Sequence, residues 1–501
     1  MTGHPSRPPR ESPSTPPEAH RRRLFRGSCI ALIATSVAFA TVGAVMLTLK
    51  TVFVLTNQQV GWIAGAGLWG FAVSQLLFAP LCDTLGMRTL LRMAFAAHVG
   101  GVVLMMTAAG FWSLLAGALI IAMGNGLVEA ACNPLVATLY PDDRTVRLNR
   151  FHVWFPGGIV LGGLAAFGLD RLGLGLWQLK LGLILIPTLL YGALLLAEPF
   201  PDTEGVQSGV SMGEMFRATF TSPFLYLMLT AMAMTASLEL GPNRWVPAVL
   251  EAGGIPGILV LVWISGLMAV LRYSAGPVVH RLRPTGLLLG GAILAGVGLM
   301  WLSVAETAAM AFASATLFAA GVCYFWPTML GVVSERIPRS GALGLGLMGT
   351  VGMAVVGIVT SPAMGRIADR YAHDRLTPDL VVPVLESAVA TLPDLVASAP
   401  GATGQDLAMA AGAARDVLRH FNVEGVLPAP ATANALRAVS ATDADPSLAW
   451  RAAAVLGPAD NYGGRVSFRY LTPLAAVLVV VFGVLYARDT AAGPIPEPAA
   501  R

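Results

Sequence analysis

The sequence predicts an all-α polytopic membrane protein with twelve transmembrane helices in two six-helix halves. Of its 501 residues, 55% are apolar and only 12% are charged, whereas soluble domains carry about 25% charged residues. The mean hydropathy is +0.69, and windows of about 20 apolar residues recur along the chain. This composition argues against a soluble enzyme.

The distribution of charged residues, cysteines and histidines predicts no binding site for a nucleic acid, a metal or a cofactor. The formal net charge is +4, but the basic residues stand singly between apolar runs rather than on one solvated face. All four cysteines lie inside apolar runs, so neither disulfides nor a zinc site are expected. The seven histidines show no metal-ligand spacing, and no phosphate-binding loop or nucleophile elbow occurs.

The apolar windows place the spans in chain order. The N-terminal half, 27–198, holds spans near 27–50, 60–82, 89–109, 112–138, 149–168 and 176–197. The C-terminal half, 219–371 and 466–488, holds spans near 219–249, 255–275, 285–303, 309–333, 342–366 and 466–487. Residues 199–218 form a cytoplasmic linker, and 1–26 and 489–501 are cytoplasmic tails, the first of them disordered.

Arginine asymmetry predicts the orientation. Fifteen arginines from Arg21 to Arg488 lie next to the spans on one side, against Lys50, Arg171 and Lys180 in the short loops opposite. By the positive-inside rule both termini are cytoplasmic, in a plasma membrane that would be the inner membrane of a bacterium. The uncharged stretch Ala31–Leu49 is too long for a signal peptide and is expected to remain as the first span.

Residues 372–465 interrupt the pattern between the eleventh and twelfth spans. This insert carries ten acidic residues and six arginines, and the topology makes it extracytoplasmic. It is expected to be a small helical cap or a partly disordered loop, with a substrate-capture lid as an alternative. A further alternative makes the protein a membrane enzyme or sensor whose working part is this insert, although the insert lacks a nucleophile motif.

A pair of similar segments suggests that the two halves are repeats. Pro80 follows the second span and Pro277 follows the eighth, 197 residues later. Two six-span halves of similar layout are typical of transporters built from parallel repeats.

In the fourth span, Asn125, Glu129 and Asn133 recur at every fourth residue and therefore share one helix face. A carboxylate in mid-membrane costs about 2.5–3.5 kcal/mol, so this face should border a cavity. Because burial disfavours the charged form, such a carboxyl group could take up a proton. The alternative is a structural carboxyl group satisfied by a neighbouring helix.

The seventh span carries further candidates for binding a solute. Gly241 and Pro242 are expected to break the seventh span beside Glu239, Asn243, Arg244 and Trp245, with Glu239 and Arg244 able to pair. The alternative is a proline kink with snorkelling charges.

In the tenth span, Tyr324 and Trp326 could stack on a sugar ring or serve as interface anchors. In the fifth span, His152 is interpreted as an interfacial histidine, with a proton relay as the alternative. The glycines 157, 158, 162, 163, 341, 344, 346 and 349 are expected to let helices pack closely.

The loop between the second and third spans resembles the signature loop of the major facilitator superfamily. It reads PLCDTLGMR from Pro80 to Arg88 and includes Asp83 and Gly86. The resemblance implies the major facilitator fold, a gating loop at Asp83, Gly86 and Arg88, and a monomer.

Within that superfamily, segments 53–61 (FVLTNQQVG), 126–134 (GLVEAACNP) and 147–149 (RLN) are similar to the fucose–galactose proton symporters. The resemblance assigns proton coupling and sugar binding to Glu129, with Asn133 beside it. Gly43 stands where that family has an aspartate in the first helix, and Glu239 is the candidate for a compensating acid.

These observations predict a secondary active transporter of a small polar solute, a sugar by resemblance, that works by alternating access and proton symport. The proton is the coupling ion. The alternative is a major facilitator uniporter or exporter of another small solute.

Overall fold

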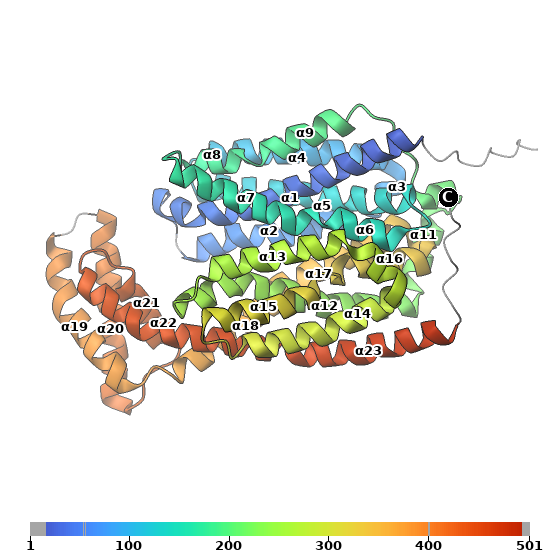
Figure 1. Ribbon diagram of the computed structural model, residues 1–501. Helices are drawn as coiled ribbons and strands as arrows, with labels where there is room; N and C mark the ends of the chain where they lie inside the picture. Colours follow the sequence, from blue (N-terminus) through green and yellow to red (C-terminus); the bar gives the residue numbers. More distant parts are fainter. Residues whose placement is uncertain (1–16, 54, 56, 399–400, 493–501) are drawn as a thin grey trace, which may run out of the picture.

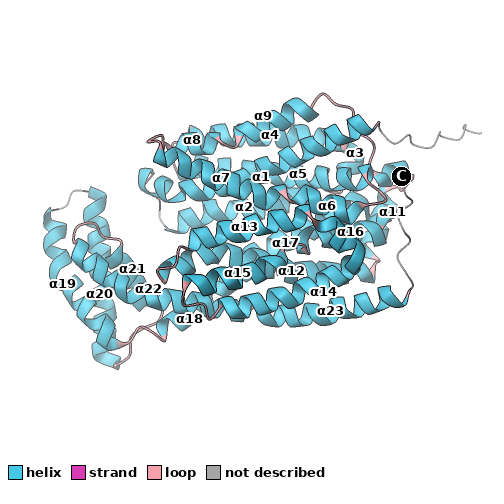
Figure 2. Cartoon of the chain, viewed as in Figure 1, coloured by secondary structure: helices cyan, strands magenta, loops and turns pink. Residues whose placement is uncertain are grey.

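The computed structural model describes residues 17–53, 55, 57–398 and 401–492, and every regular element in these ranges is a helix. Figure 2 shows the helices joined by short loops. In Figure 1 the N-terminal helices, in blue to blue-green, lie over the C-terminal ones, in green to red. We call the end where α1 begins and α23 finishes the terminal end, and the opposite one the insert end.

The N-terminal half is built from nine helices that make six crossings. They are α1 (Glu18–Val52), α2 (Asn57–Phe78), α3 (Cys82–Leu85), α4 (Met87–Met106), α5 (Phe111–Leu139), α6 (Arg144–His152), α7 (Trp154–Arg171), α8 (Trp177–Gly182) and α9 (Leu185–Leu195). The fifth crossing joins α6 to α7, and the sixth joins α8 to α9. The expected disordered tail is wrong in part, because residues 18–26 belong to α1; residues 1–16 lie outside the described residues.

The linker between the halves contains two short helices, α10 (Glu204–Gln207) and α11 (Met212–Phe220). Ser211 starts α11 by accepting a hydrogen bond from the Glu214 backbone N–H, and Glu214 accepts one from the Ser211 N–H in return. This reciprocal capping fixes the start of the helix.

The C-terminal half makes six more crossings. Its helices are α12 (Pro223–Ala252), α13 (Gly257–Tyr273), α14 (Ala275–Leu302), α15 (Ala308–Val322), α16 (Phe325–Arg336), η1 (Pro338–Ser340), α17 (Gly341–Val355), η2 (Val356–Thr360), α18 (Ser361–His373) and α23 (Thr472–Ala491). The expected break in the seventh span is wrong: α12 continues through Pro242 and Pro247.

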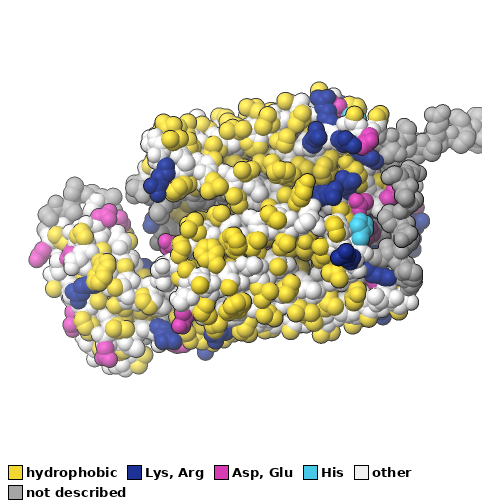
Figure 3. Space-filling view, viewed as in Figure 1, with side chains coloured by type: hydrophobic (Ala, Val, Ile, Leu, Met, Phe, Trp, Pro, Cys, Tyr) yellow, Lys and Arg dark blue, Asp and Glu magenta, His cyan; other side chains and the backbone are white. Residues whose placement is uncertain are grey.

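The helices are long and apolar enough to cross a membrane twelve times. Eleven stretches among the described residues meet both criteria, and the shorter apolar helix Gly257–Tyr273 completes the set. Figure 3 shows a broad band of hydrophobic side chains across the face of the bundle in view, with lysine and arginine gathered towards its ends. This distribution is that of an integral membrane protein, whose apolar surface faces lipid and whose charges face water.

The halves touch at the terminal end through small residues. A Cβ atom on Gly346 of α17 would overlap the methyl group of Ala79, and one on Gly349 would overlap the Gln75 side chain next to it on α2. The close approach of α17 to α2 therefore depends on glycine, as expected for helices packed at membrane depth.

The insert forms a helical body of its own at the insert end (Figure 1). It consists of α19 (Pro378–Ser398), α20 (Gly401–Glu424), α21 (Ala431–Ser440) and α22 (Pro446–Arg469) around a separate apolar core. Asn461 of α22 donates to the Val249 carbonyl oxygen of α12 at 2.7 Å, and Arg465 donates to the Ala305 carbonyl oxygen at 2.9 Å. Of the two main expectations for this segment, the described residues form the helical cap, and it packs on the C-terminal half.

Replacing Gly346 with valine should separate the halves at the terminal end, because the new side chain has no room against Ala79. Spin labels on Thr84 and Arg339, both exposed at that end, should move apart in pulsed electron paramagnetic resonance. Gly163→Val is the matched control, since a Cβ there meets open space. An unchanged distance distribution in Gly346→Val would contradict the role given to this crossing.

Candidate functional site

A cavity of about 330 Å³ lies between the halves and contains both acids singled out from the sequence. We call it the central cavity. Both halves line it, with residues Phe71, Glu129, His152, Phe155, Glu239, Leu240, Arg272, Trp326 and Met353. Charged groups thus meet at the interface of the two halves, where neither half alone encloses them.

Glu129 is held in this cavity by amides rather than by a cation. Its Oε2 accepts hydrogen bonds from Asn133 Nδ2 at 3.3 Å and from Gln75 Nε2 at 3.4 Å. The first bond follows from the four-residue spacing on α5, and α2 supplies the second. Glu129 is buried and forms no ion pair within the described part of the chain. A carboxyl group in this setting can be satisfied with or without a proton.

His152 extends the network from Glu129 towards the other half. Its Nε2 lies 3.1 Å from Asn133 Oδ1, and the side chain is buried against the central cavity. The interpretation of His152 as an interfacial histidine is therefore wrong. Residues Arg144–His152 form a separate helix, α6, whose last turn carries the ring inwards.

The second acid, Glu239, is paired with Arg272 and not with Arg244. Arg272 Nη2 lies 2.9 Å from Glu239 Oε1, and both side chains are buried. The expected pair with Arg244 fails because five residues turn a helix by about 140°, onto another face. Glu239 Oε2 has no hydrogen-bond partner among the described residues.

Arg272 also links the halves directly. Its Nη1 donates to the His152 carbonyl oxygen at 3.0 Å, and its Nε donates to the Cys323 carbonyl oxygen. One guanidinium group therefore joins α13 to α12, to the end of α15 and to the N-terminal half. Arginine suits this position because its planar donors can serve several acceptors at once.

A second cavity, of about 460 Å³, lies on the insert side of the first. It contains Asn125, one turn before Glu129 on α5, and Arg244, which follows Glu239 on α12. Gly43 and apolar side chains of α1, α2 and α5 line the rest. His98 Nε2 lies 2.9 Å from Asn125 Oδ1, and His98 Nδ1 lies 3.1 Å from the Tyr191 hydroxyl. We call this space the insert-side cavity.

The remaining predicted solute contacts lie in different surroundings. Trp326 lines the central cavity, and its indole Nε1 is buried without a hydrogen-bond partner in the described residues. Tyr324 instead donates its hydroxyl to the Leu271 carbonyl oxygen at 2.8 Å. Trp245 packs near Gly365 of α18, and Asn243 Oδ1 is buried without a partner. Neither cavity is lined by Tyr324, Asn243 or Trp245.

The predicted gating loop makes its contacts mainly with the N-terminal half and the linker. Asp83 accepts a hydrogen bond of 2.6 Å from the Thr203 hydroxyl, and Arg88 donates to the Leu196 carbonyl oxygen at 2.9 and 3.1 Å. Gly86 has φ +81°, a backbone conformation that favours glycine. Burial raises the pKa of Asp83, and the hydrogen bond from Thr203 offsets part of that effect.

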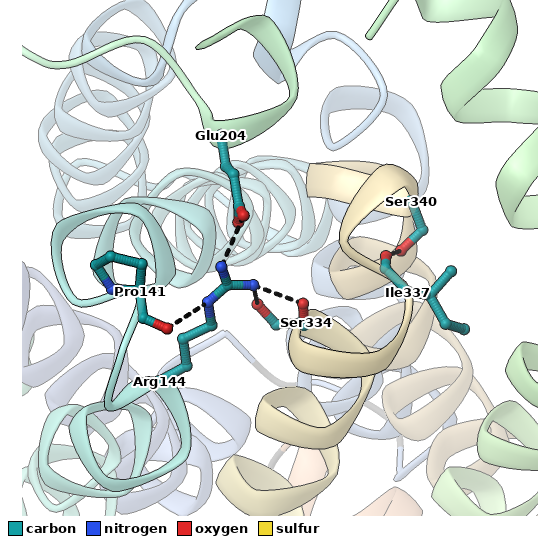
Figure 4. A network of polar contacts seen from close by, with 6 residues as sticks. All are labelled: Pro141, Arg144, Glu204, Ser334, Ile337 and Ser340. Carbon is teal, nitrogen blue, oxygen red and sulfur yellow. Dashed lines mark hydrogen bonds and ion pairs between the residues drawn. The ribbon is translucent and has the colours of Figure 1, made fainter. Parts of the chain in front are cut away.

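A separate polar network ties the halves at the terminal end (Figure 4). Arg144 at the start of α6 donates to the Ser334 carbonyl oxygen of α16 at 2.7 Å and lies 2.6 Å from Glu204 Oε1 of the linker. Beside it, the Thr145 hydroxyl donates to Glu335 Oε1 at 2.6 Å. In this structure the halves are in contact at the terminal end.

Sequence reasoning missed Arg272, Gln75 and Arg144 as site residues. Arg272 lies in the predicted eighth span, 255–275, and a charged residue inside an apolar window is itself a signal of function. Gln75 and Arg144 carried no comparable signal, because their roles depend on which helix packs against them.

Comparisons with known proteins agree with this architecture. The family model described as Major Facilitator Superfamily matches residues 28–361. A hexose transporter of Saccharomyces cerevisiae is 28% identical over 153 residues, which cover 29% of this chain and 27% of that protein. A myo-inositol transporter of Candida albicans is 25% identical over 138 residues, covering 27% and 25%. The chain thus matches about a quarter of the length of these relatives.

Solved structures share the fold at low sequence identity. A proton:xylose symporter bound to a bromodeoxyglucose matches with a TM-score of 0.59 and 15% identity, over 70% of this chain and 89% of that one. The Escherichia coli fucose:proton symporter matches with a TM-score of 0.55 and 18% identity, over 70% and 93%. A bacterial homologue of the human lysosomal transporter Spinster matches with a TM-score of 0.57 and 14% identity, over 96% and 100%.

The Arg272–Glu239 pair gives a stability prediction. Arg272→Gln leaves a buried carboxylate without its cation, which costs about 3–5 kcal/mol, and adding Glu239→Gln should recover part of this loss. Unfolding of the purified protein in detergent, followed by tryptophan fluorescence, measures the stability of the single and the double variant. Arg469→Gln, which removes a hydrogen bond to Ser303, should have a small effect. A double variant no more stable than Arg272→Gln would show that the pairing does not matter.

Asp83 gives a prediction about pH. Because its pKa is raised by burial, the folded state holds this proton more tightly than the unfolded chain does. Stability is therefore lost as pH rises through the raised pKa. Asp83→Asn keeps the acceptor for Thr203 and removes the charge, so its melting temperature should exceed that of the wild type at about pH 7.5 and approach it at about pH 4. Equal melting temperatures at both pH values would contradict the burial argument.

Proposed function

The chain belongs to the major facilitator superfamily, and we propose that it is a secondary active transporter that couples uptake of a small sugar to entry of a proton. The family consists of membrane transporters and not enzymes. The alternative within the family is a uniporter or exporter of another small solute.

The proposal depends most on the setting of Glu129. This carboxyl group is buried between the halves, faces a cavity that also contains Arg272, and has amide donors but no ion pair among the described residues. A permanently charged group would be costly there, whereas a group that gains and loses a proton during each cycle would not. Glu239, neutralised by Arg272, is proposed to take part in coupling as the second acid.

Two routes would carry the protonation state of Glu129 to the contact between the halves. Gln75, which donates to Glu129, lies against Gly349 of α17. Asn133, the other donor, contacts His152, whose carbonyl oxygen accepts from Arg272. Loss or gain of the proton changes both donor contacts, so it would shift the balance between conformations in which different ends are closed.

A sugar is proposed as the solute on two grounds. The curated relatives are named as hexose and myo-inositol transporters, and one structural neighbour was solved with a deoxyglucose derivative. The central cavity combines polar groups with aromatic side chains, Phe71, Phe155 and Trp326, a combination that suits the polar edge and apolar face of a sugar ring. Of the predicted contacts, Trp326 lines the central cavity and Asn125 and Arg244 line the insert-side cavity. These three, with Asn133 beside Glu129, are the ones proposed to meet the solute.

We further propose that both termini face the cytoplasm and that the insert is extracytoplasmic, because the arginines concentrate on the terminal side. The membrane would be the plasma membrane, the inner one in a bacterium, and the protein would work as a monomer. In this orientation the contacts of Arg144 and Thr145 close the cytoplasmic end.

Glu129→Gln should abolish concentrative uptake while leaving solute exchange. A proton moving through 100 mV supplies about 2.3 kcal/mol, which at about 1.36 kcal/mol per decade concentrates a neutral solute roughly fifty-fold. Purified protein in proteoliposomes, tested with a panel of labelled hexoses, deoxyhexoses and pentoses with and without an inward proton gradient, measures this accumulation. The variant should equilibrate the solute without accumulating it.

Glu306→Gln is the matched control, because Glu306 is exposed near Arg465 at the insert end and lines neither cavity. Its accumulation should equal that of the wild type. Gradient-driven accumulation by Glu129→Gln would refute proton coupling through this residue. Absence of transport by the wild type for every sugar, neutral or charged, would refute the substrate class.

A further inference from the structure

Arg244 is a cation with no partner in the insert-side cavity. It lines that cavity from α12 and remains exposed. No hydrogen bond or ion pair involves it in the described part of the chain, and the nearest acid in sequence, Glu239, is already paired with Arg272. A guanidinium group carries five donors and stays charged at every physiological pH. This positive charge is therefore not compensated by any described residue that lines the cavity.

Asn125, the other polar residue that lines this cavity, also offers it hydrogen-bond donors. The contact of His98 Nε2 with Asn125 Oδ1 uses the amide oxygen, which leaves the Asn125 NH₂ group for the cavity. The other lining residues are apolar or glycine, and include Phe39, Val42 and Ile63. Among the described residues, the lining thus offers donors and a positive charge but no carboxylate.

The cavity also has unused room beside Gly43, within its apolar wall. A Cβ atom built on Gly43 would meet nothing within 4 Å, so this residue leaves space in the insert-side cavity. A solute of a few polar groups could occupy that space. Its acceptor atoms would face Arg244 and Asn125.

We propose that the transported solute is a small polyhydroxylated carboxylate, a sugar acid, whose carboxylate binds Arg244 and Asn125. This inference rests on the proposed function and narrows its substrate class. Arginine recognises carboxylates with two parallel hydrogen bonds. Hydroxyl groups at the other end of the solute would extend towards Glu129, since Asn125 and Glu129 are one turn apart on α5.

The charge of the solute has an electrical consequence. One proton moving with one neutral sugar carries a net positive charge across the membrane, whereas one proton with one monoanion carries none. Uptake of the sugar acid would then follow the pH gradient, by about tenfold per pH unit, and would not respond to the membrane potential.

Matched pairs of solutes test this inference in proteoliposomes: galactose with galacturonate, glucose with glucuronate, and xylose with xylonate. Wild-type protein should prefer at least one anion over its neutral counterpart by about tenfold or more, the size expected for a charge-assisted contact. A potassium–valinomycin potential should leave the uptake of that anion unchanged. Arg244→Gln should bring the preference close to one, and Arg244→Lys should keep part of it.

Two controls separate binding from folding. Arg469→Gln removes a cation outside both cavities and should keep the preference of the wild type. If Arg244→Gln fails to fold, the thermal shift of the wild type and of Arg244→Lys decides, because the anion should raise the melting temperature of both and the neutral sugar should not.

The outcomes distinguish this inference from the proposed function. Transport of neutral sugars with equal or better efficiency would overturn the sugar-acid assignment and leave sugar transport intact. A preference for the anion that persists in Arg244→Gln would overturn the role of Arg244. If no sugar and no sugar acid is transported or bound, the proposed function fails, and this inference fails with it.

Discussion

The centre of the molecule depends on the contacts of the Arg272 guanidinium group. It neutralises Glu239 within the C-terminal half and donates to the His152 carbonyl oxygen of the N-terminal half. A charge at this depth is tolerated only when it is paired or faces a cavity, and Arg272 meets both conditions. Because its partners belong to both halves, the buried polar groups lie where the halves meet. The crossings of α17 over α2 and of α6 against α16 then complete the contact at the terminal end.

The two buried acids are physically different, although the sequence presents them alike. Glu239 has a cation at 2.9 Å, so a proton has to compete with Arg272 for it. Among the described residues, the hydrogen-bond partners of Glu129 are two amides, at 3.3 and 3.4 Å, so its charge can change without breaking an ion pair. The polar chain from Glu129 through Asn133 and His152 ends at Arg272. A change at the first acid therefore reaches the second through a short series of direct contacts.

Much of the fold and part of the site could be predicted from the sequence. Apolar windows gave the twelve crossings because a bilayer imposes its thickness on every span, and the spacing of Asn125, Glu129 and Asn133 gave a shared face because a helix has 3.6 residues per turn. Contacts between helices were not predictable in the same way. The partner of Glu239 lies on α13, the inward position of His152 depends on α6, and the continuity of α12 through Pro242 depends on its packing. The insert was located by composition, but its four-helix body required the structure.

Infrared difference spectroscopy of the purified protein during a pH titration is the most direct test of Glu129 as the proton carrier. A protonated carboxyl group absorbs apart from a carboxylate, so each titrating acid contributes a band that is lost when it ionises. The account predicts that one such band of the wild type is missing from Glu129→Gln and that solute binding shifts its titration. A spectrum of Glu129→Gln that keeps every titrating band of the wild type would contradict the account.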